Sequence, residues 1–345
     1  EKNSLGFSQT LASQGIIHGG TKYSLTGAIT NSTKAISLMP KLWRNSINGI
    51  GNVKLDKKIL EQDYQFLWSS EKISTKVIGF FASKLMNSKL EKINQEEEKI
   101  FSKSKDKLNL YKLNEPIINV KKTIETLYDQ IGKNCYKCEV KKIVKKDSVY
   151  QTVITNSGNL EASQIILLAG EGSEEILSNS GILNFKIQKR PLAMPIVFLE
   201  KIIPKFFGHY FGIGSKPIMT ISSHSRPDGT VLYLGGDIAE TGVLKSDREQ
   251  KLETKKILKQ LLPWLDLNIK KINILRINRI EPFSKFKRPD LPFVEEINNL
   301  IVGWPIKLAF APLLAKIILE KNITSPKEYN FKKMFNVNIG KYPWD

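Results

Sequence analysis

The segment EKNSLGFSQTLASQGIIHGGTKY, residues 1–23, carries the strongest structural information in this chain. From residue 6 to residue 27 the chain is rich in Gly, Ser and Thr and holds few signals of regular secondary structure. Small residues let a ligand approach the backbone closely. We therefore predict an ordered loop that lies against a bound ligand. Residue 1 is Glu rather than Met, so we expect the chain to begin inside a longer protein.

Outward from this loop, helical patterns come first and strand patterns follow. The pattern is helical from residue 28 to about residue 103, with an apolar face over residues 35–50 and a charged helix with an exposed face over residues 90–101. A further helix is expected from an N-cap at Asn119 to a terminator at Gly132. Three strands are expected to follow, at residues 137–145, 149–155 and 164–169. The last of them is a continuous apolar run, typical of a strand buried on both faces.

The second half of the chain predicts short strands, a helix, and a closing strand and helix. An amphipathic helix is expected over residues 245–262, a strand over 299–303 and a helix over 312–321 that starts with proline. A turn at RPDG, residues 226–229, joins two of the short strands. No low-complexity linker separates the halves, so we expect interleaved domains. The short strands are expected at residues 194–199, 217–222 and 230–234.

Size and composition indicate a folded protein of two domains or one large α/β unit. The chain has 345 residues, of which 41% are hydrophobic and 25% charged, which excludes wholesale disorder, collagen and a disulfide scaffold. The net charge is +19, from 53 basic and 34 acidic residues. Only seven of the basic residues are Arg, and surfaces that bind nucleic acid usually use Arg as well as Lys. We therefore do not expect nucleic acid as the partner.

Cysteine usage and hydropathy point to a cytoplasmic protein without a bilayer-spanning segment. Cys135 and Cys138 cannot form a zinc site alone, because four ligands are needed, and their run is strand-like where a redox pair would open a helix. We expect no metal and a reducing compartment. The longest apolar stretch, residues 300–319, contains two prolines and two lysines and does not predict a membrane span, although peripheral membrane contact stays open.

Four segments fit one family in their order and spacing. They are residues 1–23 with Ile17-His18-Gly19-Gly20, residues 157–170 (SGNLEA through IILLAG), Arg190-Pro191, and residues 299–312 (NLIVGWPIKLAFAP). Together they resemble FAD-dependent oxidoreductases of the D-amino-acid-oxidase type. This family includes glycine oxidases, glycerol-3-phosphate dehydrogenases and 2-hydroxyglutarate dehydrogenases, and the first segment is most similar to the last two groups.

The resemblance implies an α/β fold with two interleaved domains. One is a Rossmann-like FAD-binding domain of the glutathione-reductase-like type, at residues 1–34, 112–185 and 296–345. The other comprises a helical insertion plus a mixed-sheet substrate domain, at residues 35–111 and 186–295.

One part of the family pattern has no counterpart in this sequence. The first strand, the GxGxxG turn and the first helix, on the order of 30 residues, are not found. Gly212-Ile-Gly214 lacks the third Gly and a following helix. Glu1 stands where the family keeps an acidic residue at the end of its second strand. We therefore expect a truncated reading frame that does not bind FAD competently, with a natural cofactor-free relative as the alternative.

The resemblance assigns FAD contacts to four places. Glu1 would bind the ribose hydroxyls, and the loop from Gln9 to Gly15 would lie beside the pyrophosphate and the flavin. Ala169 and Gly170 leave room where a strand end passes the dinucleotide. The backbone from Gly303 to Leu308 and the Lys307 side chain would lie at the flavin N1–C2=O edge, where a positive charge raises the reduction potential. The complete predicted set is Glu1, Gln9, Thr10, Ala12, Ser13, Gln14, Gly15, Ala169, Gly170, Gly303, Lys307 and Leu308.

His18 and Lys307 are the predicted catalytic residues, and three cations are predicted to bind substrate. Lys22 lies where glycerol-3-phosphate dehydrogenases keep a cation for the phosphate, although Lys loses the bidentate geometry of Arg. Arg276 and Arg279 would each bind a substrate carboxylate, with structural ion pairs as the alternative. His209 and His224 are further acid–base candidates, and an ordinary structural histidine is the alternative for each.

The function implied by the resemblance is oxidation of a small amine, amino acid or 2-hydroxy acid by FAD. Electrons would pass to oxygen or to a quinone-linked acceptor, and the substrate would be a small anion. Two alternatives stay open: a flavin domain that acts in tRNA base modification, which the charge of +19 would suit, and a cofactor-free basic RNA-binding relative.

Overall fold

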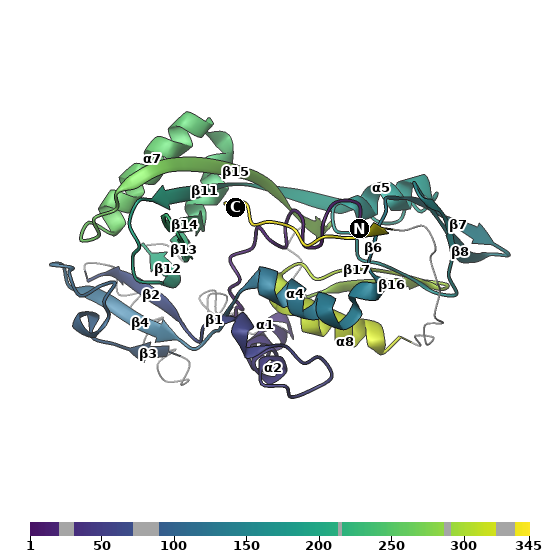
Figure 1. Cartoon of the computed structure of the whole chain (residues 1–345), viewed down its shortest axis with the longest axis horizontal. Helices are drawn as coiled ribbons and strands as arrows, with labels where there is room; N and C mark the ends of the chain where they lie inside the picture. The colour runs from purple at the N-terminus through teal and green to yellow at the C-terminus, as the bar shows by residue number, and fades with distance from the viewer. Residues whose placement is uncertain (21–30, 72–89, 213–215, 286–290, 322–334) are drawn as a thin grey trace.

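The structure is a computed structural model of the chain, and it describes residues 1–20, 31–71, 90–212, 216–285, 291–321 and 335–345. Two halves lie side by side in Figure 1. The left half is built on a large mixed sheet, and the right half holds smaller sheets and most of the short helices. Mixed α/β architecture with a large mixed sheet was predicted from the sequence, and the structure confirms it.

Within the described residues, the large sheet has eight strands in the order β15-β11-β14-β13-β12-β2-β4-β3. Its neighbours are antiparallel except for β12 and β2, which run parallel. The RPDG turn lies between β13 and β14, as predicted. The long strands β11 and β15 reach from this sheet toward the other half (Figure 1). The strand bounds are Gln65–Ser70 (β2), Leu90–Lys92 (β3), Leu108–Leu113 (β4), Ile187–Leu199 (β11), Phe207–Phe211 (β12), Pro217–Arg226 (β13), Gly229–Gly235 (β14) and Ile269–Pro282 (β15).

In the part of the chain that the structure describes, the second half contains two three-stranded sheets and two short strand pairs. One sheet has the order β10-β17-β16, in which β10 and β17 are parallel, and the other is antiparallel with the order β7-β8-β9. Strand β1 pairs with β5, and β6 with β18. The bounds are Leu60–Gln62 (β1), Ile117–Ile118 (β5), Tyr136–Lys137 (β6), Val140–Lys146 (β7), Val149–Thr155 (β8), Gly158–Glu161 (β9), Ile165–Leu167 (β10), Phe293–Ile297 (β16), Leu300–Trp304 (β17) and Phe335–Asn336 (β18).

The helices begin and end largely where the capping signals place them. Asn119 caps α4 by accepting a hydrogen bond from Lys122 N, and Gly132 follows its last residue, as predicted. Ser246 and Glu249 form a capping box at the start of α7. Within the described residues, no helix is long and apolar enough to cross a bilayer. The bounds are Asn31–Ser37 (α1), Met39–Ile47 (α2), Val120–Ile131 (α4), Gly172–Asn179 (α5), Asp237–Thr241 (α6), Asp247–Leu261 (α7) and Ala311–Leu319 (α8).

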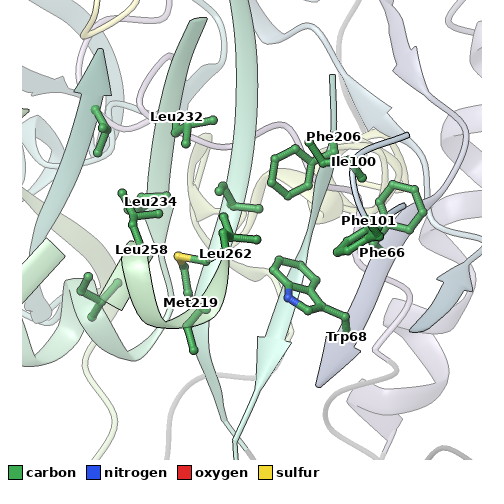
Figure 2. Close-up of a cluster of buried hydrophobic side chains, with 14 of the residues drawn as sticks. Phe66, Trp68, Ile100, Phe101, Phe206, Met219, Leu232, Leu234, Leu258 and Leu262 are labelled. Atoms are coloured by element: carbon green, nitrogen blue, oxygen red, sulfur yellow. The ribbon is translucent and has the colours of Figure 1, made fainter. Parts of the chain in front are cut away.

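An aromatic cluster forms the largest core, between the large sheet and α7 (Figure 2). Trp68 of β2 is fully buried, and its ring lies 5.6 Å from that of Phe101 and 6.1 Å from that of Phe206, both near edge-on. Such edge-to-face pairs add to the free energy gained by burying the rings. This core keeps β2 and β12 together, and these two strands carry residues of the candidate site.

The helix predicted over residues 90–101 is wrong, and the wider helical pattern is also wrong for the described residues 60–71 and 90–103. Among the described residues before residue 104, α-helix is found up to Ile47, and residues 90–92 form β3, in which Leu90 faces Leu113 of β4. Residues 95–97 form a single 3-10 turn capped by Asn94. The reason is tertiary: pairing with β4 and burial of Ile100 and Phe101 in the aromatic core outweigh the local helical preference of a charged segment.

The expectation that the apolar run at 164–169 is buried on both faces is also wrong. Ile165 and Leu167 are buried, whereas Ile166 is 40% and Leu168 47% exposed. Among the described residues, β10 pairs only with β17, and the second face of β10 has little covering it. An apolar run therefore marks this strand without telling which of its faces is covered.

Candidate active site

The N-terminal loop is fixed to the large sheet by its own polar groups. Gln14 Nε2 donates to the carbonyls of Tyr233 (2.9 Å) and Thr220 (3.2 Å). The Ala12 carbonyl accepts from the Tyr233 hydroxyl at 2.8 Å, and Gln9 Oε1 accepts from Ile280 N at 3.1 Å. Burial raises the pKa of Tyr233, which keeps this phenol a hydrogen-bond donor at ordinary pH. Several of the predicted cofactor residues thus also hold the two halves together.

Two residues of the same loop have features that suit a ligand. Gly15 has φ +71°, and a Cβ there would lie 2.2 Å from the Ile118 carbonyl, so only Gly fits. Ser13 Oγ is buried and has no hydrogen-bond partner in the part of the chain that the structure describes. A buried hydroxyl without a partner costs free energy, and a bound group could supply that partner. Thr10, the remaining predicted residue here, is exposed.

His18 lies in a polar cluster between the two halves. Its Nδ1 is 3.6 Å from Glu115 Oε2, and its ring is stacked on that of His209 with centroids 5.6 Å apart. Glu115 is 3% exposed and accepts from Gly19 N at 2.7 Å and from Gln65 Nε2 at 2.5 Å. The His18 side chain is 23% exposed, so the cluster reaches the surface of the loop. A partly exposed imidazole beside a buried carboxylate can take up and release a proton.

The other two histidines differ in their surroundings. His209 of β12 is buried, and its Nδ1 lies 2.7 Å from Thr220 Oγ1, so it belongs to the His18 cluster. His224 of β13 is instead stacked on Trp344, with centroids 4.3 Å apart. Burial lowers the pKa of His224 to about 4. His224 is therefore neutral at ordinary pH and packs as an aromatic ring.

The segment after β17 shares a core with the N-terminal loop. Leu11 and Ile17 are buried in the same hydrophobic cluster as Ala309 and Phe310, and Leu308 packs against it. Lys307 precedes the 3-10 turn Leu308–Phe310, with its Nζ 5.4 Å from the Phe310 ring centroid. Gly303 is a buried residue of β17, paired with Val294 of β16. The fold thus brings the first and last predicted cofactor segments together.

Ala169 and Gly170 follow β10 at the edge of that sheet. The Gly170 carbonyl accepts from Trp304 Nε1 at 3.2 Å, which ties this turn to the end of β17. Gly170 has φ +57° and nothing within 4 Å of where a Cβ would be, so the space beside it is open. Contact of this turn with a dinucleotide stays a prediction.

The remaining predicted residues have structural partners or lie elsewhere. Glu1 is exposed, and its Oε1 accepts from Asn3 N at 2.9 Å. Arg276 pairs with Asp247 and donates to backbone carbonyls before α7, while Arg279 pairs with Glu240 at 3.0 Å. Each Arg thus has the structural ion pair that was the alternative prediction. Lys22 falls outside the described residues.

Sequence reasoning did not find three members of the His18 cluster: Glu115, Gln65 and Thr220. Nothing local marks Glu115, which follows β4 and precedes a proline, as a buried carboxylate. Gln65 lies in a stretch that was predicted to be helical. Glu115 lies 97 residues from His18 along the chain, and Gln65 lies 47 residues from it. Only the fold brings these residues together.

One relative is similar over almost the whole chain. A probable FAD-dependent oxidoreductase of Pseudomonas aeruginosa is 36% identical over 336 residues, which are 95% of this chain and 86% of that protein. The chain belongs to the FAD-dependent oxidoreductases. The family predicted from four short segments is thereby confirmed. No family model matches the chain.

Solved structures agree with this oxidoreductase in fold. The crystal structure of the FAD-dependent oxidoreductase from Pseudomonas aeruginosa has a TM-score of 0.79 at 30% identity and covers 100% of this chain and 89% of that one. Iminodiacetate oxidase from Chelativorans sp. BNC1 gives 0.64 at 14% identity, covering 97% and 91%. Glycine oxidase from Bacillus cereus gives 0.63 at 13% identity, covering 93% and 89%. The last two identities are low enough that these likenesses show the fold alone.

Proposed function

We propose that this oxidoreductase binds FAD between its N-terminal loop and the segment after β17, and oxidises a small amine, amino acid or 2-hydroxy acid. The observation that carries the proposal is the 36% identity, over 95% of the chain, to a protein named as an FAD-dependent oxidoreductase. The proposed FAD-binding unit keeps the predicted residues 1–34, 112–185 and 296–345.

Three local features support FAD at this place. The Ser13 hydroxyl is buried without a partner among the described residues, Gly15 closes the loop where only Gly fits, and the space beside Gly170 is open. Lys307 would bring positive charge to the flavin edge. The printed sequence has no GxGxxG turn, so we assign no residue to that part of a dinucleotide site. FAD, when bound, would supply the two-electron acceptor of the reaction.

His18 is the residue that we propose for proton transfer. Oxidation of an amine or alcohol at carbon releases the N–H or O–H proton, which a base must accept. His18 is partly exposed at the loop surface, and Glu115 and His209 contact its ring. We do not extend the proposal to Arg276 and Arg279, because each already pairs with a carboxylate.

The test is anaerobic reduction of the flavin by a panel of compounds. The protein should be purified, and its absorbance should show bound flavin. Amino acids, N-methyl amino acids and 2-hydroxy acids are then added without oxygen, with neutral alcohols as controls. We expect one of the acids to bleach the flavin and the alcohols to leave it oxidised. Reoxidation by oxygen compared with a soluble quinone identifies the acceptor.

Variants of the site separate binding from chemistry. His18→Gln should keep the flavin and slow its reduction by about 10²–10⁴-fold, the range typical for loss of a general base. A colourless protein, or a flavin that no compound of the panel reduces, would contradict the proposed function.

A further inference from the structure

Glu115 is a buried carboxylate with a hydrogen bond to each of its oxygens. Its carboxylate is 3% exposed, and each oxygen accepts a short hydrogen bond: Oε1 from Gly19 N at 2.7 Å and Oε2 from Gln65 Nε2 at 2.5 Å. A carboxylate buried this deeply is costly unless its oxygens are bonded. The bonds join the loop that carries His18 to β2, so Glu115 fixes the backbone directly after His18.

The orientation of the Gln65 amide bears on the charge of the Glu115 carboxylate. Its Nε2 donates to Glu115, while its own Oε1 is buried without a hydrogen-bond partner in the part of the chain that is described. If the Gln65 amide were turned over, its oxygen would face the Glu115 oxygen, and two acceptors would meet. The observed orientation therefore fits an ionised carboxylate, which accepts hydrogen bonds and donates none. An ionised Glu115 presents its negative charge to His18, whose Nδ1 lies 3.6 Å from Oε2.

Two contacts of the His18 ring are of different kinds, one at its edge and one on its face. Glu115 Oε2 lies at its edge, 3.6 Å from Nδ1, and His209 lies on its face with an interplanar angle of 26°. His209 is in turn fixed by Thr220 Oγ1, 2.7 Å from its Nδ1. An acceptor beside Nδ1 favours the tautomer with hydrogen on Nδ1, so that Nε2, across the ring, carries the lone pair.

We propose that Glu115 is a positioning residue: it selects the Nδ1–H tautomer of His18 and orients the ring so that Nε2 takes the substrate proton. Gln65 holds Glu115 in place, and His209 limits rotation of the His18 ring. This rests on the proposed function for the step that His18 performs. The tautomer and the ring orientation do not depend on that function and can be tested separately.

The first measurement uses the unaltered protein. With ¹⁵N-labelled histidine, the two ring nitrogens of His18 are assigned through loss of their signals in His18→Gln, above the pH at which the ring is charged. We expect hydrogen on Nδ1. A ring with hydrogen on Nε2 overturns the proposal, and this result needs no substrate and no stable variant at Glu115.

The second measurement compares Glu115→Gln with a matched control. Glu281→Gln removes a carboxylate that is 1% exposed and bonded to Gln188 and Arg190, on strand β15. In Glu115→Gln we expect a mixture of His18 tautomers and a loss of about 10–100-fold in kcat with KM within about threefold, as for removal of other orienting groups. Glu115→Asp, which keeps the charge, should restore the Nδ1–H tautomer and part of kcat. Glu281→Gln should leave both unchanged.

The outcomes distinguish the two proposals. If no compound reduces the flavin while His18 carries Nδ1–H only in the presence of Glu115, the proposed function fails and the positioning stands. If kcat falls equally in Glu115→Gln and Glu281→Gln, or if Glu115→Gln keeps the wild-type tautomer, Glu115 is merely structural. Thermal unfolding of each variant shows whether a loss reflects folding, and Glu115→Asp carries the comparison if Glu115→Gln does not fold.

Discussion

At the scale of single residues, the three histidines show how surroundings set the role of one residue type. His18 is partly exposed and lies beside a carboxylate, His209 is buried against a hydroxyl, and His224 is stacked on Trp344. His18 combines partial exposure with a carboxylate oxygen 3.6 Å from its ring nitrogen. Their local sequences differ, but local sequence does not show burial or partners, so all three were acid–base candidates.

His224 makes the stability of the protein dependent on pH. Burial lowers its pKa from 6.5 to about 4, although Glu61 and Asp345 act in the opposite direction. Well above pH 6.5 the His224 ring is neutral in both the folded and the unfolded state. Its ionisation then does not change the free energy of unfolding. As the pH falls from 6.5 to 4, the unfolded chain binds a proton that the folded protein does not, so the free energy of unfolding decreases by at most about 3 kcal/mol.

His224→Phe should remove this pH dependence, since Phe can stack on Trp344 without ionising. Urea unfolding of both proteins between pH 7 and pH 4 measures it. The wild type should lose more stability than the variant over this range. Parallel curves for the two proteins would show that the His224 proton does not contribute.

At the scale of elements, two helix caps of the same kind have different connections. Ser246 bonds only within the first turn of α7, in a capping box with Glu249. Asn119 caps α4 and also contacts β1 and the C-terminal tail, because its Nδ2 donates to Glu61 and its Oδ1 accepts from the Tyr342 hydroxyl at 3.0 Å. Loss of a cap that contacts three elements should lower the free energy of unfolding more than loss of a cap that contacts one.

Replacing each cap by Ala separates these roles. Ser246→Ala should lower the free energy of unfolding by about 1 kcal/mol, the usual effect of losing an N-cap. Asn119→Ala should cost about 2–4 kcal/mol, because the bonds to Glu61 and Tyr342 are lost as well. Chemical denaturation measures both. Equal losses would mean that the additional Asn119 contacts contribute nothing.

At the scale of the whole molecule, the N-terminal loop and the C-terminal tail connect the two halves. The tail runs from β18 to the middle of the molecule (Figure 1), and Trp344 packs there against Tyr233 with centroids 5.0 Å apart. Tyr233 donates to the Ala12 carbonyl, and Gln14 bonds back to the Tyr233 carbonyl. The loop that we propose to hold FAD is therefore supported by the large sheet and, through it, by the tail.

Gln14→Met tests this connection, because Met has a similar volume and cannot donate to the two carbonyls. We expect a loss of about 1–3 kcal/mol and faster hydrogen exchange at Ile17 N–H, which bonds to Pro116 O. Gln95→Met is the matched control, since Gln95 Nε2 also donates to two carbonyls, those of Ser104 and Asp106. Unchanged exchange at Ile17 in Gln14→Met would mean that the loop does not depend on this bond.

Sequence patterns predicted the elements that are decided locally. Caps at Asn119 and Gly132, the RPDG turn and the helix near residues 245–262 follow from backbone preferences of the residues themselves, and the structure confirms them. The family also followed from short motifs such as Ile17-His18-Gly19-Gly20, because small residues recur where backbone and ligand must lie close. Sequence thus determined the class of fold, the family and the loop that carries His18.

Tertiary structure decided what depends on partners distant along the chain. Residues 90–92 became a strand because β4 offered backbone bonds, and a charged helix pattern could not reveal this. Arg276 and Arg279 form ion pairs with carboxylates of α7 and α6. Local sequence does not specify these partners. The site around His18 combines residues from a loop, β2, β12, β13 and the turn after β4. Whether a buried carboxylate meets a histidine is decided by the packing of whole sheets, and no local pattern encodes it.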